Sequence, residues 1–158
     1  MINPFQMKPY SASQRIRGVL LVLLMLFAGI AEGKPHSAFT PPPGSSERRQ
    51  ILGSLRHEIS RLHRLEVVFV VDYLKVQDGW AWVETRPQSP DGQSRYEGVS
   101  ALLRKSGGLW RIAELACSGP DDPECLGSPD YFRKLKARFP ALPLSVLPPG
   151  SVAGVPRK

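Results

Sequence analysis

Hydrophobic and polar residues alternate with a helical period over residues 45–64. The apolar positions recur every three or four residues, at Ile51, Leu52, Leu55, Ile59 and Leu62. In a helix that turns about 100° per residue, these side chains fall on one side. Ser45 and Ser46 are candidate N-cap residues, and Glu47 suits the positive start of a helix. The pattern predicts an amphipathic helix with one buried stripe.

The apolar stretches that follow are rich in β-branched and aromatic residues, which favours strands. We expect four of them, at residues 66–76, 80–85, 96–105 and 109–117. The turn sequences Asp78-Gly79 and Gly107-Gly108 join the first pair and the last pair as hairpins, and a polar loop at 87–94 joins the hairpins to each other. Connections this short predict an antiparallel meander.

Ser128-Pro129-Asp130 predicts a second helix, because Ser is a favoured N-cap and Pro is favoured at the first helical position. This helix should be short and end near Phe139. The order of elements predicts an α+β domain at residues 45–140, with the N-terminal amphipathic helix packed on a four-stranded antiparallel meander and a short C-terminal helix. Proline-rich segments flank it, a leader at 32–44 and a tail at 141–158.

Residues 1–31 have the composition of a secretory signal peptide. The basic residues at its start are Lys8, Arg15 and Arg17. The uncharged segment 19–31 follows and ends in small residues. As a helix it would span about 20 Å, less than the ~30 Å core of a bilayer. We therefore expect cleavage after Ala31, or alternatively after Gly33, a periplasmic or secreted location, and only transient contact with the membrane.

The chain is basic, with a formal net charge of +7 over 158 residues. Three of the excess charges belong to the signal sequence, so the exported chain would carry +4. Arginines gather on the polar side of the first predicted helix, and Arg49, Arg56 and Arg64 are candidate binding residues for an acidic partner or for anionic envelope material. The alternative is an ordinary solvated helix face. Export argues against nucleic acid as the partner, because that compartment holds little of it.

The two cysteines, Cys117 and Cys125, are separated by seven residues. In an exported protein two cysteines most often pair, so we predict a disulfide. A metal site would need C-x2-C spacing or neighbouring histidines. His57-Glu58 begins like the metal-binding helix of a zinc protease, but Arg61 stands where the second histidine is required. We expect no metal and no cofactor.

Sequence motifs of nucleophilic and nucleotide-dependent enzymes do not occur in the chain. Three carboxylates in the predicted sheet remain as candidates for catalysis, Asp72, Glu84 and Glu114. Asp72 interrupts an apolar strand, Glu84 follows the two tryptophans of its strand on one face, and Glu114 is expected on the face of Trp110 and Ile112. They either line a pocket as general bases or pair with arginines at the rim of the sheet. The arginines on neighbouring strands are Arg86, Arg104 and Arg111.

Trp80 and Trp82 share one face of their strand, because side chains alternate along it. Two interpretations stay open. The pair lies in the core beneath the first helix, or it is exposed and forms a platform that binds a ligand or partner.

Several motifs between residues 41 and 115 resemble a recurring domain of exported bacterial proteins. They are residues 43–45, 69–76, 79–83, 87–92, 101–105 and 110–112. The order of helix and antiparallel strands also resembles cystatin-like and NTF2-like folds. The resemblance implies the fold and the exported location, and it implies no catalytic residues, because fold alone does not set function.

These patterns lead to one main hypothesis for function and two alternatives. The main hypothesis is a small exported, non-enzymatic binding module, an inhibitor or immunity-type protein or an envelope accessory, with a protein or a cell-envelope ligand as its partner. The first alternative is an NTF2-like enzyme with a pocket, in which Asp72, Glu84 or Glu114 is a general base toward a small organic substrate. The second is a structural accessory without a discrete ligand.

Overall fold

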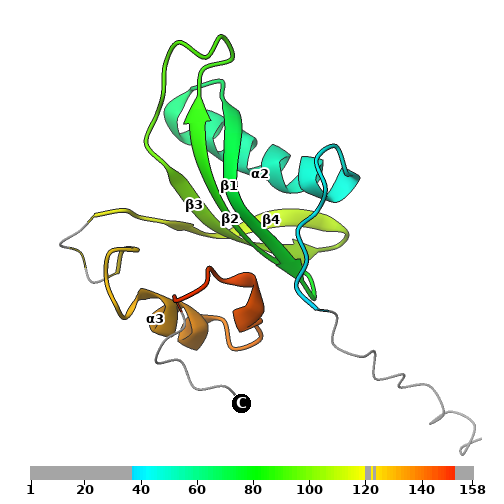
Figure 1. Ribbon diagram of the computed structural model, residues 1–158, viewed down its shortest axis with the longest axis vertical. Coiled ribbons are helices and arrows are strands. Elements are labelled where there is room, and N and C mark those ends of the chain that lie inside the picture. The colour runs from blue at the N-terminus through cyan, green and yellow to red at the C-terminus, as the bar shows by residue number, and fades with distance from the viewer. Residues whose placement is uncertain (1–36, 120–121, 123, 152–158) are drawn as a thin grey trace, which may run out of the picture. The chain divides into compact units, whose positions relative to one another are not determined.

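The computed structural model describes residues 37–119, 122 and 124–151 (Figure 1). The elements are α2 (Ser46–His63), β1 (Val68–Gln77), β2 (Trp80–Gln88), β3 (Val99–Ser106), β4 (Leu109–Ala116), α3 (Tyr131–Arg138) and the 3-10 turn η1 (Leu144–Val146). The strands form one antiparallel sheet in the order β1-β2-β3-β4. The predicted α+β fold class is therefore confirmed. The predicted signal peptide lies outside the described residues.

Helix α2 begins and ends where its sequence favours it. The Ser45 hydroxyl accepts a hydrogen bond from the backbone N–H of Arg48 at 3.2 Å, which satisfies one of the free donors at the helix start. Arg64 ends the helix in the left-handed conformation, with φ 57°. The buried stripe contains Ile51, Leu55 and Ile59. It stops one turn earlier than predicted, because Leu62 is 46% exposed.

The sheet is apolar on both faces, and each face packs against different parts of the chain (Figure 1). Along β2, Ala81 and Val83 belong to the cluster beneath α2, whereas Trp80 and Trp82 belong to the cluster with α3 and η1. The expectation that the tryptophans lie under the first helix is wrong. The small residues of β2 face the long helix, and the large indoles fill the opposite side.

The indoles pack against the aromatic residues of the C-terminal segment. Trp82 makes edge-to-face contacts with Tyr131 and Phe132, with ring centroids 6.4 and 5.4 Å apart. Trp80 makes the same type of contact with Phe139 at 5.6 Å. Edge-to-face arrangements are favourable because the positive ring edge meets the negative ring face. Helix α3 is thus attached to the sheet through aromatic packing.

Residues beyond 140 take part in the same core. Leu142, Val146 and Leu147 are buried, and the Tyr73 hydroxyl donates a hydrogen bond to the Leu147 carbonyl at 2.9 Å. The packed domain therefore extends past the expected boundary at residue 140. Helix α3 also begins later than predicted, with Asp130 rather than Ser128 at its N-cap.

Among the described residues, no helix combines the length and the hydropathy that a bilayer crossing requires.

Truncating Leu142 tests the contribution of the C-terminal segment to the core. Leu142 is fully buried, whereas Leu109 is 58% exposed. We expect Leu142→Ala to lower the free energy of unfolding by about 2–5 kcal/mol, the usual cost of a cavity in a core. Leu109→Ala, the same chemical change, should alter it by less than about 0.5 kcal/mol. Urea unfolding measures both, and equal effects would contradict the packing described for Leu142.

Candidate functional site

The first candidate carboxylate, Asp72, lies at an irregularity of strand β1. Val71 pairs with Thr85 and Tyr73 pairs with Glu84, so Asp72 is the extra residue of a β-bulge. Its side chain is exposed and binds the Arg86 guanidinium at 2.7–3.1 Å. The hydrogen bond from Arg86 lowers the pKa of Asp72 below its ordinary value. Asp72 is therefore half of a surface ion pair.

The second candidate, Glu84, has its hydrogen-bond partner in its own strand, β2. It accepts a hydrogen bond from the indole N–H of Trp82 at 3.0 Å. It also lies opposite Tyr73 in the β1–β2 pair. Burial, and secondarily the charge of Glu84, raises the pKa of the Tyr73 phenol. Glu84 thus satisfies the polar atom of a buried indole.

The third candidate, Glu114, lies on a different face from the one predicted. Leu102 pairs with Glu114 and Leu103 pairs with Ile112, so Ala113 is an extra residue in β4. This bulge reverses the alternation, because one added residue moves all later side chains to the other face. Glu114 consequently faces α3 instead of sharing a face with Trp110 and Ile112.

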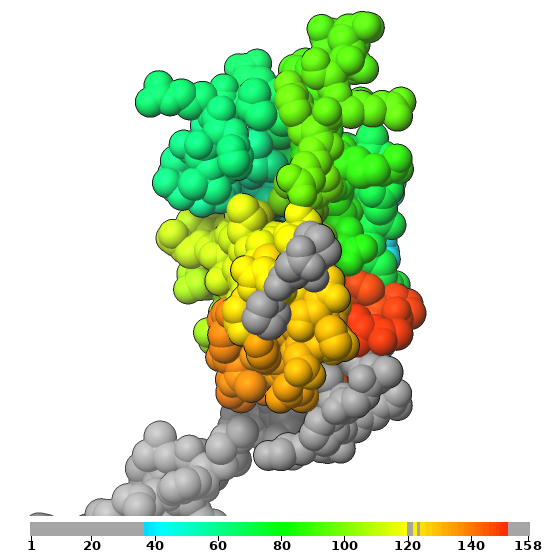
Figure 2. Space-filling view, turned by 90° about the vertical axis from the view of Figure 1, so that its left-hand side faces the viewer, coloured from blue at the N-terminus to red at the C-terminus, as the bar shows by residue number. Residues whose placement is uncertain are grey.

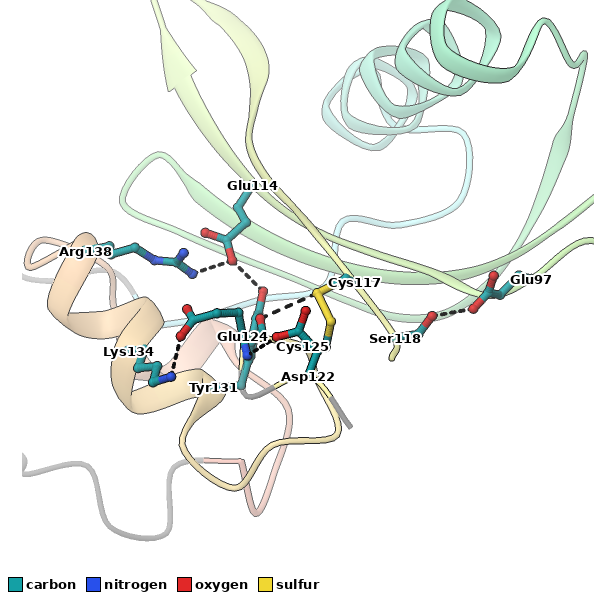
Figure 3. The surroundings of a disulfide bond; sticks show 10 residues. All are labelled: Glu97, Glu114, Cys117, Ser118, Asp122, Glu124, Cys125, Tyr131, Lys134 and Arg138. Atoms are coloured by element: carbon teal, nitrogen blue, oxygen red, sulfur yellow. Dashed lines mark hydrogen bonds and ion pairs between the residues drawn. A yellow bond between two sulfur atoms is a disulfide. The ribbon is translucent and has the colours of Figure 1, made fainter. Parts of the chain in front are cut away.

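Glu114 links the sheet to helix α3 (Figure 3). It accepts a hydrogen bond from the Tyr131 hydroxyl at 2.7 Å and pairs with the Arg138 guanidinium at 2.5 Å. Burial and the bond to Glu114 raise the pKa of the Tyr131 phenol well above its ordinary value. The structure thus gives Asp72, Glu84 and Glu114 separate partners and does not bring them together in one cavity.

The predicted binding arginines of α2 also have structural contacts. The guanidinium of Arg56 donates to the Val67 carbonyl at 3.0 Å and lies over the Phe69 ring. Arg49 donates to the Gly44 carbonyl, and Arg64 forms the C-terminal cap. Arg49 thus fastens the helix to the segment that precedes it, and Arg56 fastens it to the segment that follows. Arg64 is exposed.

Trp80 and Trp82 offer no surface to a ligand. They are 4% and 0% exposed, respectively. The described structure therefore places both indoles in the core, and an exposed platform at these positions is ruled out for this conformation.

A groove with a volume of about 590 Å³ opens where α2 ends. We call it the helix-end groove. Its apolar wall contains Ile59, Leu65, Val67, Pro87, Tyr96, Val99, Leu115 and Ala116. Its rim contains His63, Glu97, Gly98, Ser118, Gly119 and Asp122, together with the cystine. Figure 2 shows the face where these segments meet, with α2 in teal, the β2–β3 connection in green and the end of β4 in yellow.

The groove arises from strands of unequal length. The β1–β2 ladder continues to Gln88, whereas the β2–β3 ladder stops at the pair Thr85 and Val99. Beyond that pair only an isolated bridge joins Gln88 to Arg95. The residues between Arg95 and Val99 therefore leave the regular sheet and form one side of the groove.

The disulfide forms another side of the groove, and its prediction is confirmed. Cys117 and Cys125 are bonded, with Cα atoms 4.7 Å apart. The backbone N–H of Leu126 donates to the Cys117 carbonyl at 2.9 Å. Asp122 lies beside the two sulfur atoms, within 4.8 Å. Cysteine binds metals as a thiolate. Cys117, Asp122 and Cys125 therefore offer no thiolate ligand while the disulfide is intact.

The groove is apolar inside and acidic at the rim. Glu97 accepts a hydrogen bond from the Ser118 hydroxyl, and Asp122 accepts one from the backbone N–H of Glu124 at 2.8 Å. Neither carboxylate makes an ion pair with a described residue, and no Lys or Arg lines the groove. Sequence reasoning missed this site, because its apolar residues look like ordinary core positions. Only the cysteine pair pointed to this region.

Comparisons with known proteins add no further assignment. No protein-family model matches the chain, and neither a curated protein nor a solved structure matches it significantly.

The contact between Tyr131 and Glu114 predicts a dependence of stability on pH. The pKa of Tyr131 is raised in the folded state, so this stabilisation is complete below the unfolded value of about 10 and is lost as the pH rises through the folded value. We expect the free energy of unfolding to fall between about pH 9 and pH 12, and to fall less steeply in Tyr131→Phe.

At neutral pH, Tyr131→Phe should cost about 1 kcal/mol, the usual net value of a hydrogen bond. Tyr96→Phe is the matched control, because the tyrosine hydroxyls with a hydrogen bond among the described residues are those of Tyr73 and Tyr131. Urea unfolding at each pH measures all three proteins. Parallel pH profiles for wild type and Tyr131→Phe would show that the phenol does not titrate as described.

Proposed function

We propose that the protein is a small exported, non-enzymatic binding module that holds its ligand in the helix-end groove. The observation that carries the proposal is the groove itself, whose walls remain apolar at the surface. Its partner is a protein or a cell-envelope ligand, and the membrane is contacted only during export.

The dimensions and lining of the groove suit a ligand. Binding pockets commonly have volumes of about 300–1,000 Å³ and mostly apolar walls with a few polar groups, and the helix-end groove has about 590 Å³. Apolar walls open to water carry an unfavourable hydration free energy, which a ligand removes on binding. Ile59, Val99 and Leu115 come from three different elements, so the groove forms only in the folded chain.

Several contacts hold the walls of the groove in place before a ligand arrives. Arg56 ties α2 to Val67, and the disulfide fixes the segment after β4. A preformed site binds more tightly, since less conformational entropy is lost on binding. This supports recognition by shape.

The enzyme alternative receives less support from the geometry. A carboxylate that acts as a general base must lie within hydrogen-bond reach of the bound substrate. Asp72 is paired with Arg86, Glu84 accepts from Trp82, and Glu114 is bound by α3. None of these three carboxylates lines the helix-end groove. The arrangement of one helix on an antiparallel sheet supports a cystatin-like or NTF2-like type as a proposal about fold only.

Export is supported by the disulfide, because such bonds persist in oxidising compartments. We expect the chain isolated from an envelope or periplasmic fraction to begin at Glu32, after cleavage at Ala31, and to contain no thiol that reacts with iodoacetamide. Intact-mass spectrometry measures both properties. An unprocessed chain with two alkylated cysteines would contradict export.

A neutral, apolar fluorescent probe, N-phenyl-1-naphthylamine, tests binding in the groove. We expect it to bind the wild-type protein and to bind Val99→Thr about two- to fivefold more weakly, because a hydroxyl replaces a methyl group in the apolar wall. Val70→Thr is the matched control, since Val70 is exposed and lies outside the groove. Absence of probe binding, or equal weakening by both variants, would reject the groove as the binding site.

A further inference from the structure

We propose that the ligand of the helix-end groove is an extended segment of a partner protein that carries a lysine or arginine next to apolar residues. This inference rests on the proposed function, because it assumes that the groove is the binding site. It specifies the chemistry of the partner through the charge of the rim, the apolar wall and the exposed backbone beside it.

The rim of the groove is negatively charged on a protein that is otherwise basic. Many surface carboxylates are neutralised by cations, in the pairs Glu47–Lys105, Glu58–Arg61, Asp72–Arg86, Glu124–Lys134 and Asp130–Arg133. Glu97 and Asp122 instead have a hydroxyl and a backbone N–H as partners (Figure 3). Both side chains are exposed, so their charge faces whatever occupies the groove.

A cation that binds at this rim also has apolar surface beside it. Leu65, Val99 and Leu115 line the same groove as the two carboxylates. Lysine and arginine suit such a boundary, since their aliphatic stems cover apolar surface while the charged group stays in water. An adjacent Leu or aromatic residue of the ligand would fill the interior. The expected recognition element is therefore basic and apolar together.

Exposed backbone beside the groove favours a polypeptide over a small organic cation. Gly98 and Gly119 both line it, and neither has a positive φ. A Cβ at Gly98 would meet its nearest atom, the Thr85 carbonyl oxygen, at 3.6 Å, an ordinary contact. The fold thus does not require glycine at this position. A residue without a side chain allows another backbone to approach closely.

Strand β4 borders the groove through Leu115 and Ala116. Just after the strand, the Cys117 carbonyl already accepts a hydrogen bond from the backbone N–H of Leu126 at 2.9 Å. The charge of the rim, the apolar wall and the exposed glycine backbone therefore point together to a polypeptide ligand.

A pair of blocked pentapeptides tests the charge requirement. One has the sequence Ser-Leu-Arg-Leu-Ser, and the other has citrulline, the neutral isostere of arginine, in place of Arg. We expect the arginine peptide to bind the wild-type protein roughly three- to tenfold more tightly at low salt, the range of two exposed ion pairs. High salt should remove this preference. Isothermal titration calorimetry measures both peptides, and equal affinities at low salt would overturn the proposal.

Isosteric variants of the rim locate the effect. Glu97→Gln and Asp122→Asn keep an oxygen that accepts the observed hydrogen bonds and remove the charge. We expect the double variant to lose the preference for arginine and to unfold at the same temperature as the wild type. Glu66→Gln is the matched control, because Glu66 is exposed and lies outside this groove. A preference that persists in the double variant, with wild-type thermal unfolding, would overturn the assignment of the rim.

Gly98→Ala and a small cation test the requirement for a polypeptide. We expect Gly98→Ala to weaken binding of the arginine peptide at least threefold and to weaken binding of octyltrimethylammonium less, because only the peptide brings a backbone close to Gly98. Equal effects on both would overturn the polypeptide assignment, as would binding of octyltrimethylammonium without binding of the peptide. If the wild-type protein does not bind N-phenyl-1-naphthylamine, the proposed function itself is rejected. Failure of the peptide proposal and failure of the proposed function are therefore distinguishable.

Discussion

The structure depends on a sheet that must be covered on both faces. Strand β2 is buried on each side, with Ala81 and Val83 beneath α2 and with Trp80 and Trp82 on the opposite face. A single helix would leave two indoles in water, and burial of aromatic surface is among the largest favourable contributions in a small domain. The segment after β4 is therefore part of the core, even though prolines interrupt its sequence.

Two carboxylates of the sheet, Glu84 and Glu114, serve this two-sided arrangement. Glu84 satisfies the indole N–H of buried Trp82, which would otherwise lack a partner at considerable cost. Glu114 binds Tyr131 and Arg138, at opposite ends of α3. A bulge at Ala113 turns Glu114 toward that helix. Two of the three candidate carboxylates, Glu84 and Glu114, thus supply polar contacts on the face of the sheet against which the C-terminal segment packs.

Sequence patterns predicted the elements well and their relations only in part. The period of α2, the hairpin turns and the cysteine pair are local signals, and the structure confirms each of them. Bulges at Asp72 and Ala113 depend on which residues pair across strands, so no local pattern revealed them, and the face assigned to Glu114 was wrong. Leu142 was assigned to a tail because proline is a local signal against regular structure, whereas burial is decided by the whole fold. The groove depends on where the pairing between neighbouring strands stops, which is also decided by the tertiary structure.

The average charge of the chain is a poor guide to its candidate docking surface. Two of the three predicted binding arginines of α2 bind backbone carbonyls beside the helix, so much of the basic character of this surface serves local structure. The helix-end groove has two features that matter for recognition: its walls are apolar, and its rim carries Glu97 and Asp122 with no Lys or Arg in the lining. A ligand selected by overall charge would be acidic, and two of the three candidate arginines that it would meet on α2 are already bound to backbone carbonyls. A ligand of the kind proposed for the groove would be basic and apolar, and its charge would meet Glu97 and Asp122, which make no ion pair with a described residue.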